Sequence, residues 1–171
     1  MDQQKLLELF LELVRIDAVS LKERPVADFI KERLALWEME GVEDDAGRKL
    51  NGTAGNLIIR LPGDDPASEP LLLLAHMDTV HPTAAVKPIL KEGVLYSDGT
   101  TILGVDNRAG VTLILAVLQE LYERKLRHKS LEIVFTVGEE LGMLGAMALD
   151  FSRLRARQGF VFDCTARPGG Y

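Results

Sequence analysis

The stretch that most constrains the fold of this chain is Pro70–Asp78, which reads PLLLLAHMD. Four leucines and an alanine in a row, with no polar residue between them, are typical of a strand buried on both faces of a sheet. The apolar run ends at His76, and Asp78 follows after one residue. Side chains two positions apart point to the same side of a strand, so both are expected to face one crevice. A carboxylate beside an imidazole orients a metal-binding histidine, although a polar turn after a strand gives the same pattern.

The composition is that of a globular domain and argues against several classes of partner. The chain has 171 residues, of which 47% are hydrophobic and 27% are charged, and this is the length of one domain. A formal net charge of -6 provides no basic patch for nucleic acid or an anionic membrane, and no apolar stretch is long enough to span a bilayer. Cys164 is the only cysteine, and the first residues lack a signal-peptide pattern. We therefore expect a cytoplasmic protein.

The first third of the chain is predicted to be mainly helical. Gln3–Ile16 carries apolar residues at helical spacing along one face. Ser20 and Glu23 fit a capping box, which predicts a second helix from this point to about Glu40. The segment 41–52 is rich in Asp and Gly, so we expect a polar connection there.

Strands and helices alternate in the rest of the chain. The patterns predict strands at Asn56–Leu61, at the leucine run, at Ser130–Val137 and at Gly159–Phe162, helices at Asn107–Lys125 and Leu144–Leu149, and a short hairpin around Ile89–Leu90 and Val94–Tyr96 with its turn at Glu92-Gly93. This alternation predicts an α/β fold of three layers, α/β/α, with a largely parallel central sheet.

Candidate metal ligands follow three of the predicted strands. They are His76 and Asp78 after the leucine run, Glu139 and Glu140 after strand 130–137, Asp163 after the last strand, and Asp106 at the glycine-flanked start of a helix. Ligands of open α/β sheets bind beyond the carboxyl ends of the strands, so these groups are expected to gather at one edge. Taken singly, the two glutamates could form a solvated turn and Asp106 could cap the helix. Together they would repel one another unless a cation balanced them, and the donors suit zinc, cobalt or manganese.

Several motifs also carry a family resemblance. AHMDTV, SDGTTILGVDNRAG, FTVGEELGMLGA and GFVFD, in this order and spacing, resemble the peptidase T-like branch of the co-catalytic zinc exopeptidases, whose superfamily includes carboxypeptidase G and aminoacylase. The resemblance runs from about Gln3 to Asp163. It implies a zinc-exopeptidase-like fold with two Zn²⁺ ions in each complete site. It also implies a metal-dependent exopeptidase that hydrolyses short peptides, in the manner of a tripeptide aminopeptidase.

The resemblance implies a role for each candidate residue. His76 and Asp163 match ligands of the first metal, Asp106 the bridging ligand, Glu140 a ligand of the second metal, Asp78 the carboxylate that orients the histidine, and Glu139 the general base. In this scheme two Lewis acids activate a shared water. Glu139 takes its proton and delivers it to the departing amine.

The chain also departs from the family pattern. Asn107-Arg108 stands where the branch has Asp-Lys, and we expect this change to have a modest effect. The family places a second-metal histidine far downstream, after a lid or dimerisation domain. His81 is a poor substitute for it, and His128 is expected at the opposite edge of the sheet.

We therefore interpret residues 1–171 as the N-terminal portion of a metallopeptidase catalytic domain, without the lid domain and the C-terminal catalytic segment. We expect an incomplete second metal site, weak or absent activity and an uncovered apolar sheet edge or helix face. The full-length protein would form a homodimer through the missing domain.

Other functions remain open at this stage. The same site could serve an N-acyl amino acid amidohydrolase or a carboxypeptidase, because no residue here distinguishes a free amine from a carboxylate. A non-catalytic metal-binding fragment is a further alternative. Cys164 follows Asp163 at the end of a strand, but no sequence feature assigns this thiol a histidine base.

Overall fold

In the computed structural model, which describes residues 2–65 and 67–163, the leucine run forms β3 (Leu71–His76) within a five-stranded sheet. The other strands are β1 (Gly41–Glu43), β2 (Leu57–Leu61), β6 (Leu131–Thr136) and β7 (Gln158–Val161). Their order across the sheet is β1-β2-β6-β3-β7. β3 therefore has a neighbour on each side, as its unbroken apolar sequence predicts.

The sheet is mixed, and its parallel part contains the strands that lead to the candidate ligands. β6, β3 and β7 are parallel, and the register places His76 beside Thr136, the last residue of β6. β1 and β2 are antiparallel to their neighbours. The connection 62–70 between β2 and β3 is too short for the crossover that parallel strands need, so β3 runs opposite to β2. The predicted α/β class is confirmed, and the expected parallel arrangement is corrected at β1 and β2.

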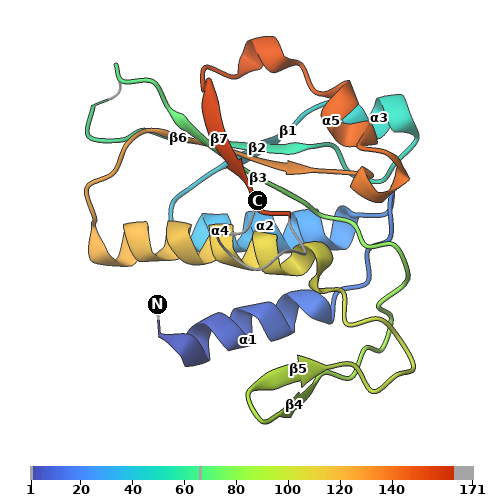
Figure 1. Cartoon of the computed structure of the whole chain (residues 1–171). Helices are drawn as coiled ribbons and strands as arrows, with labels where there is room; N and C mark the ends of the chain where they lie inside the picture. Colours follow the sequence, from blue (N-terminus) through green and yellow to red (C-terminus); the bar gives the residue numbers. More distant parts are fainter. Residues whose placement is uncertain (1, 66, 164–171) are drawn as a thin grey trace.

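Helices cover the two faces of the sheet unequally. Figure 1 shows α1 (Gln3–Val14), α2 (Arg24–Leu36) and α4 (Val105–Arg124) on one side, and α3 (Ala46–Leu50) and α5 (Leu144–Ala148) on the other. The larger hydrophobic cluster joins the first three helices to sheet residues such as Leu73, Ile133 and Phe135. A smaller cluster of Ile58, Val134 and Leu149 lies on the other face. The three predicted layers are present, and the third is thin.

One apolar edge of the sheet is uncovered. All four residues of β7 are exposed, with Phe160 at 59% and Val161 at 64%. Within the described part of the chain, β7 pairs only with β3. This observation confirms the expectation that an apolar edge is exposed.

The structure corrects three predictions in the first third of the chain. The segment 41–52 contains β1 and α3, because the Asp44 side chain accepts hydrogen bonds from the backbone of Ala46 and Asn56 and so organises the polar residues. The two helices end earlier than predicted, at Val14 and Leu36. The predicted capping box is also wrong, since the side chain of the N-cap residue Glu23 makes no capping bond to α2. Ser20 donates to Asp78 instead, and Glu23 accepts the backbone amides of Leu21 and of the distant Gly138.

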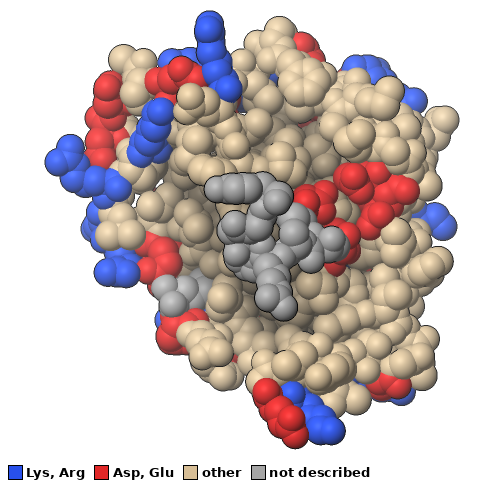
Figure 2. Space-filling model, in the orientation of Figure 1, with Lys and Arg blue, Asp and Glu red and all other residues tan. Residues whose placement is uncertain are grey.

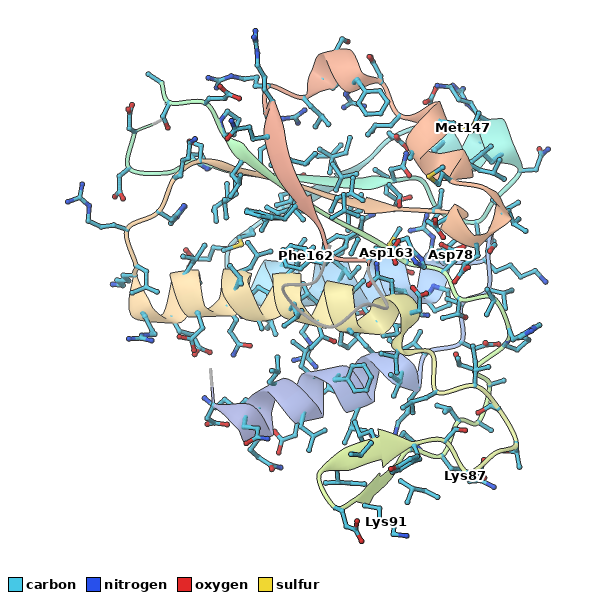
Figure 3. All side chains as sticks on the ribbon, in the orientation of Figure 1. Asp78, Lys87, Lys91, Met147, Phe162 and Asp163 are labelled. Atoms are coloured by element: carbon cyan, nitrogen blue, oxygen red, sulfur yellow. The ribbon has the colours of Figure 1, made fainter. Side chains whose placement is uncertain are left out.

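The long excursion after β3 carries the predicted hairpin, β4 (Ile89–Lys91) and β5 (Val94–Tyr96). Its turn residues Glu92 and Gly93 have positive φ angles of 53° and 78°, as a tight hairpin turn requires. Figure 3 shows Lys91 in this hairpin, well away from Asp78 and Asp163. Two short 3-10 helices, η1 (Glu139–Leu141) and η2 (Phe151–Arg153), flank α5. Among the described residues, no helix combines the length and apolar character needed to cross a bilayer.

Candidate metal centre

His76 is placed by the end of β3 and oriented by Asp78. Both side chains are buried, with exposures of 2% and 0%. The imidazole Nδ1 lies 3.2 Å from Asp78 Oδ1. Since a carboxylate favours a proton on the nearer ring nitrogen, this contact directs the lone pair of Nε2 outward in the neutral imidazole. The arrangement expected from the His-x-Asp spacing is therefore present.

Both carboxylate oxygens of Asp78 accept hydrogen bonds. Ser20 Oγ donates to Oδ2 at 2.6 Å. The backbone amides of Glu139 and Glu140 donate to Oδ1 and Oδ2 at 3.0 and 3.1 Å. Burial alone would raise the pKa of Asp78, but the bonds from His76, Ser20 and the Glu139 amide outweigh it and lower the pKa. Asp78 therefore stays ionised and joins the end of β3 to the turn after β6.

Asp106 lies opposite the other ring nitrogen, with Oδ1 3.0 Å from His76 Nε2. It stands where the chain enters α4 and where the backbone is not helical. The neighbouring Asn107 accepts a hydrogen bond from the helix amide of Gly110 at 3.0 Å. Asn107 thus caps this helix and Asp106 faces His76, which argues against Asp106 as a simple cap.

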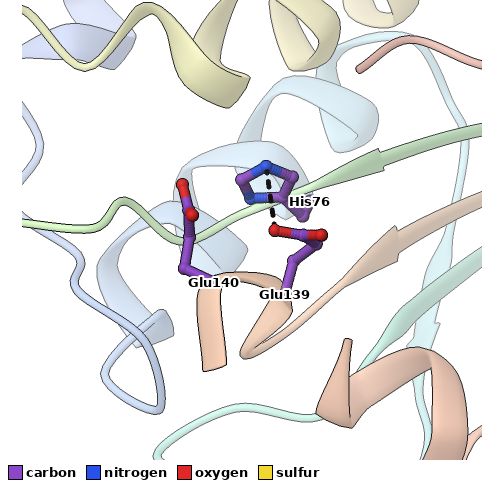
Figure 4. Close-up of side chains that lie close together, drawn as sticks. All are labelled: His76, Glu139 and Glu140. Atoms are coloured by element: carbon purple, nitrogen blue, oxygen red, sulfur yellow. Dashed lines mark ion pairs between the residues drawn. The ribbon is translucent and has the colours of Figure 1, made fainter. Parts of the chain in front are cut away.

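The remaining acids complete two groups around the same imidazole nitrogen. Glu139 Oε2 and Asp163 Oδ2 each lie 3.8 Å from His76 Nε2. Figure 4 shows Glu139 below the ring and Glu140 to its left. In each group, one potential ligand atom per residue lies within 4.8 Å of the others; the groups are His76, Glu139, Glu140 and His76, Asp106, Asp163. The predicted convergence of the candidate ligands at one edge is confirmed.

Burial and the neighbouring acids raise the pKa of the carboxylates around His76. Burial and then the neighbouring carboxylates raise the pKa of Glu140, and burial is also the largest cause of the raised pKa of Glu139 and Asp163. Burial would lower the pKa of His76, but the Asp78 bond and the charges of Asp78, Asp163 and Asp106 raise it to about 9. Figure 2 shows acidic side chains gathered on the right of this face, the side on which Figure 3 labels Asp78 and Asp163.

These donors fit a divalent cation. One imidazole nitrogen and several carboxylate oxygens converge from separate strands, and their negative charges are only partly balanced by the protein. Imidazole with carboxylates is a donor set for zinc, cobalt or manganese. Two groups that share one histidine are compatible with two neighbouring ions, provided that an aspartate such as Asp106 bridges them.

The other candidates from the sequence lie elsewhere. His81 is exposed and belongs to neither ligand group among the described residues. His128 precedes β6. Its backbone is hydrogen-bonded to Asp64 and lies close to Gly63, so it is at the opposite end of the strands, as predicted. Cys164 lies outside the described residues.

Sequence reasoning underestimated Arg108. Its side chain is fully buried, and its guanidinium donates to the Met77 carbonyl between His76 and Asp78. A second bond, 3.3 Å long, reaches the carbonyl of Ile16 after α1. Burial lowers the pKa of Arg108 to about 10, so the guanidinium is charged at neutral pH. Only its place in the motif, two residues after Asp106, signalled a role.

An α/β sheet whose parallel strands end in one histidine and several acids defines a class of proteins with a carboxylate-rich metal centre. Comparison with known families refines this class. Residues 56–168 match the model of peptidase family M28, and the chain belongs to this family. The predicted resemblance to peptidase T-like metallopeptidases is confirmed by the relatives that follow.

Similar proteins share the fold over nearly the whole chain. The uncharacterized protein YqjE of Bacillus subtilis (strain 168) is 37% identical over 168 residues, which are 98% of this chain and 45% of that protein. The aminopeptidase PepT of Bacillus cereus ATCC 10987 superposes with a TM-score of 0.92 at 36% identity, over 97% of this chain and 44% of that one. A tripeptidase of Staphylococcus aureus subsp. aureus Mu50 gives 0.91 at 40% identity with the same coverage. The chain spans a little under half the length of these relatives.

Proposed function

We propose that this chain carries the metal centre of an exopeptidase that releases residues from short peptides, in the manner of a tripeptide aminopeptidase. The observation that carries the proposal is the surrounding of His76 Nε2, with Asp106 at 3.0 Å and Glu139 and Asp163 both at 3.8 Å. Membership in a peptidase family and similarity to an aminopeptidase and a tripeptidase support the substrate class. We place the activity in the cytoplasm, because a single cysteine cannot form a disulfide within the chain.

Two zinc ions would be held by the groups described above. Following the roles that the resemblance implies, we assign His76 and Asp163 to the first ion, Glu140 to the second, and Asp106 to both; His76, Asp106 and Asp163 form one of the groups above. When bound, the ions act as Lewis acids that activate water and polarise the scissile carbonyl. Cobalt or manganese would fit the same donors.

Glu139 is the proposed general base. It lies beside the ligands, and burial together with the acids around it raises its pKa, which brings a carboxylate closer to the value suited to proton transfer near neutral pH. Its carboxylate would take a proton from the attacking water and deliver it to the departing amine nitrogen. The backbone of Glu139 is fixed by Asp78, which accepts its amide hydrogen. Asp78 thus orients both the imidazole and the base.

The described residues supply the second ion with fewer ligands than the first. Asp106 and Glu140 are its only assigned donors, whereas the first ion also has an imidazole. We therefore expect the 171-residue chain to bind one zinc tightly and a second weakly, and to hydrolyse peptides slowly.

The proposal is tested by zinc stoichiometry together with hydrolysis of tripeptides and N-acetyl amino acids. Glu139→Gln should keep tight zinc binding and lower the turnover of tripeptides at least about 100-fold. Glu32→Gln, at an exposed position of α2, is the control and should match the unmodified chain. Hydrolysis of N-acetyl amino acids alone would contradict the aminopeptidase assignment. Turnover that Glu139→Gln does not change would remove Glu139 from the mechanism.

A further inference from the structure

The connection between α1 and α2 contacts the residues that support the candidate ligands. Within it, Ser20 Oγ donates to Asp78 at 2.6 Å. Three residues later, Glu23 Oε1 accepts the backbone amides of Leu21 at 2.7 Å and Gly138 at 2.9 Å. Glu23 and Asp78 are both fully buried. This short connection therefore contacts the end of β3 and the turn after β6 together.

Two buried carboxylates hold three successive amides of that turn. Gly138 donates to Glu23, Glu139 donates to Asp78 Oδ1, and Glu140 donates to Asp78 Oδ2. These amides open the 3-10 helix η1, where backbone donors lack partners within the helix. Each carboxylate thus satisfies buried or partly buried donors that would otherwise lack a partner in the protein. The turn cannot shift without breaking these bonds.

We infer that Glu23 is a positioning residue for the metal centre, since it fixes the turn that presents Glu139 and Glu140. Glu23 contacts no proposed ligand atom; it acts through the backbone at Gly138. This inference rests on the proposed function only for the identity of the bound ion. The fixed turn is a property of the metal-free chain and can be measured separately.

The geometry of Glu23 predicts which substitutions preserve its action. Both backbone bonds go to Oε1, whereas Oε2 has no hydrogen-bond partner among the described residues. Gln keeps an acceptor oxygen at the same reach, so Glu23→Gln should hold the turn. Glu23→Ala removes the acceptor and leaves the Gly138 amide buried without a partner.

The chain offers a matched control at the other end of β6. Glu132 is also buried, at 3% exposure. Its Oε2 accepts the backbone amides of Arg155 and Ala156 at 2.8 and 2.9 Å. Glu132→Ala removes the same kind of bonds from a loop that carries no candidate ligand. Any loss of zinc affinity that is caused by general destabilisation of the fold should therefore appear in both alanine variants.

The experiment compares zinc affinity, by competition with a chromophoric chelator, among the 171-residue chain and its Glu23→Ala, Glu23→Gln and Glu132→Ala variants. Hydrogen exchange of the amides at 138–140 is measured in the same proteins without metal. We expect Glu23→Ala to weaken zinc binding about 10-fold or more and to accelerate exchange at 138–140. Glu23→Gln should restore both properties, and Glu132→Ala should leave both unchanged.

The outcomes separate this inference from the proposed function. Equal zinc affinity and equal exchange in Glu23→Ala and the unmodified chain would overturn the positioning role, and so would equal losses in both alanine variants. If the unmodified chain bound no zinc, the proposed function would fail. Exchange at 138–140 would then decide the role of Glu23 as an anchor of the turn.

Discussion

The substitution Asp78→Asn removes one charge and leaves the shape of the side chain nearly unchanged. In the native site, Oδ1 faces His76 Nδ1 and the Glu139 amide, while Oδ2 faces Ser20 Oγ and the Glu140 amide. An asparagine must place its NH₂ group against one of these donor pairs. In either orientation, at least one donor loses its acceptor inside the protein.

The cost follows from these contacts. In the least costly orientation, the asparagine NH₂ group lies beside Ser20, whose hydroxyl can rotate to accept a hydrogen bond. The Glu140 amide is then left unpaired. An unsatisfied buried donor costs about 1–3 kcal/mol, and the remaining bonds lose the assistance of the charge. We expect the free energy of unfolding to fall by about 2–4 kcal/mol. The pKa of His76 should also fall well below about 9, because the bond and the charge of Asp78 are the largest causes that raise it against burial.

Urea unfolding and NMR titration of His76, both on the metal-free chain, measure these two quantities. The control is Asp150→Asn, at an exposed aspartate that accepts bonds from the backbone and hydroxyl of Ser152 and should give a much smaller loss of stability. A loss below about 1 kcal/mol in Asp78→Asn, with the pKa of His76 still near 9, would refute the reasoning.

Two further predictions concern pH. Zinc binding at pH 7 should release at least about one proton. The Asp78 bond and the surrounding acids outweigh burial and hold the pKa of His76 near 9, whereas a ligand imidazole must be neutral. Calorimetric heats of binding that are independent of the buffer's ionisation enthalpy would contradict this prediction. Bonds from Arg24 and Lys31 lower the pKa of Glu43 from 4.5 to about 2, so this carboxylate stabilises the fold above about pH 4.5 and loses that contribution as the pH falls toward 2. The shift corresponds to at most ~3.4 kcal/mol, which solvent screening reduces to about 1–2 kcal/mol. The stability difference between the unmodified chain and Glu43→Gln should therefore shrink by more than half between pH 6 and pH 3, and a constant difference would disprove it.

The gathering of the candidate ligands could be predicted because its signals are local. The end of the leucine run, the His-x-Asp spacing and the glutamates after Val137 each mark the carboxyl end of a strand. Parallel pairing of β6, β3 and β7 then brings these ends together. Any α/β arrangement with these strands parallel would have gathered the same ligands.

The hydrogen bonds that hold the candidate ligands in place could not be predicted in the same way. Ser20 and Glu23 match the local rule for a capping box, but their side chains bond to residues 58 and 115 positions further along the chain. Tertiary contacts of this length override a local preference of about 1 kcal/mol. The buried guanidinium of Arg108 is a similar case, since its acceptors are carbonyls of Met77 and Ile16, which have no side-chain signature. The direction of β2, opposite to β3, likewise depends on the short connection 62–70.

Anomalous X-ray scattering at the zinc edge, from crystals of the chain grown with zinc, tests the central claim most directly. The account predicts a peak about 2 Å from His76 Nε2 and from oxygens of Asp106 and Asp163. A weaker second peak should lie between Asp106 and Glu140. Zinc bound elsewhere, with His76 still paired to Asp106 and no peak between them, would contradict the account.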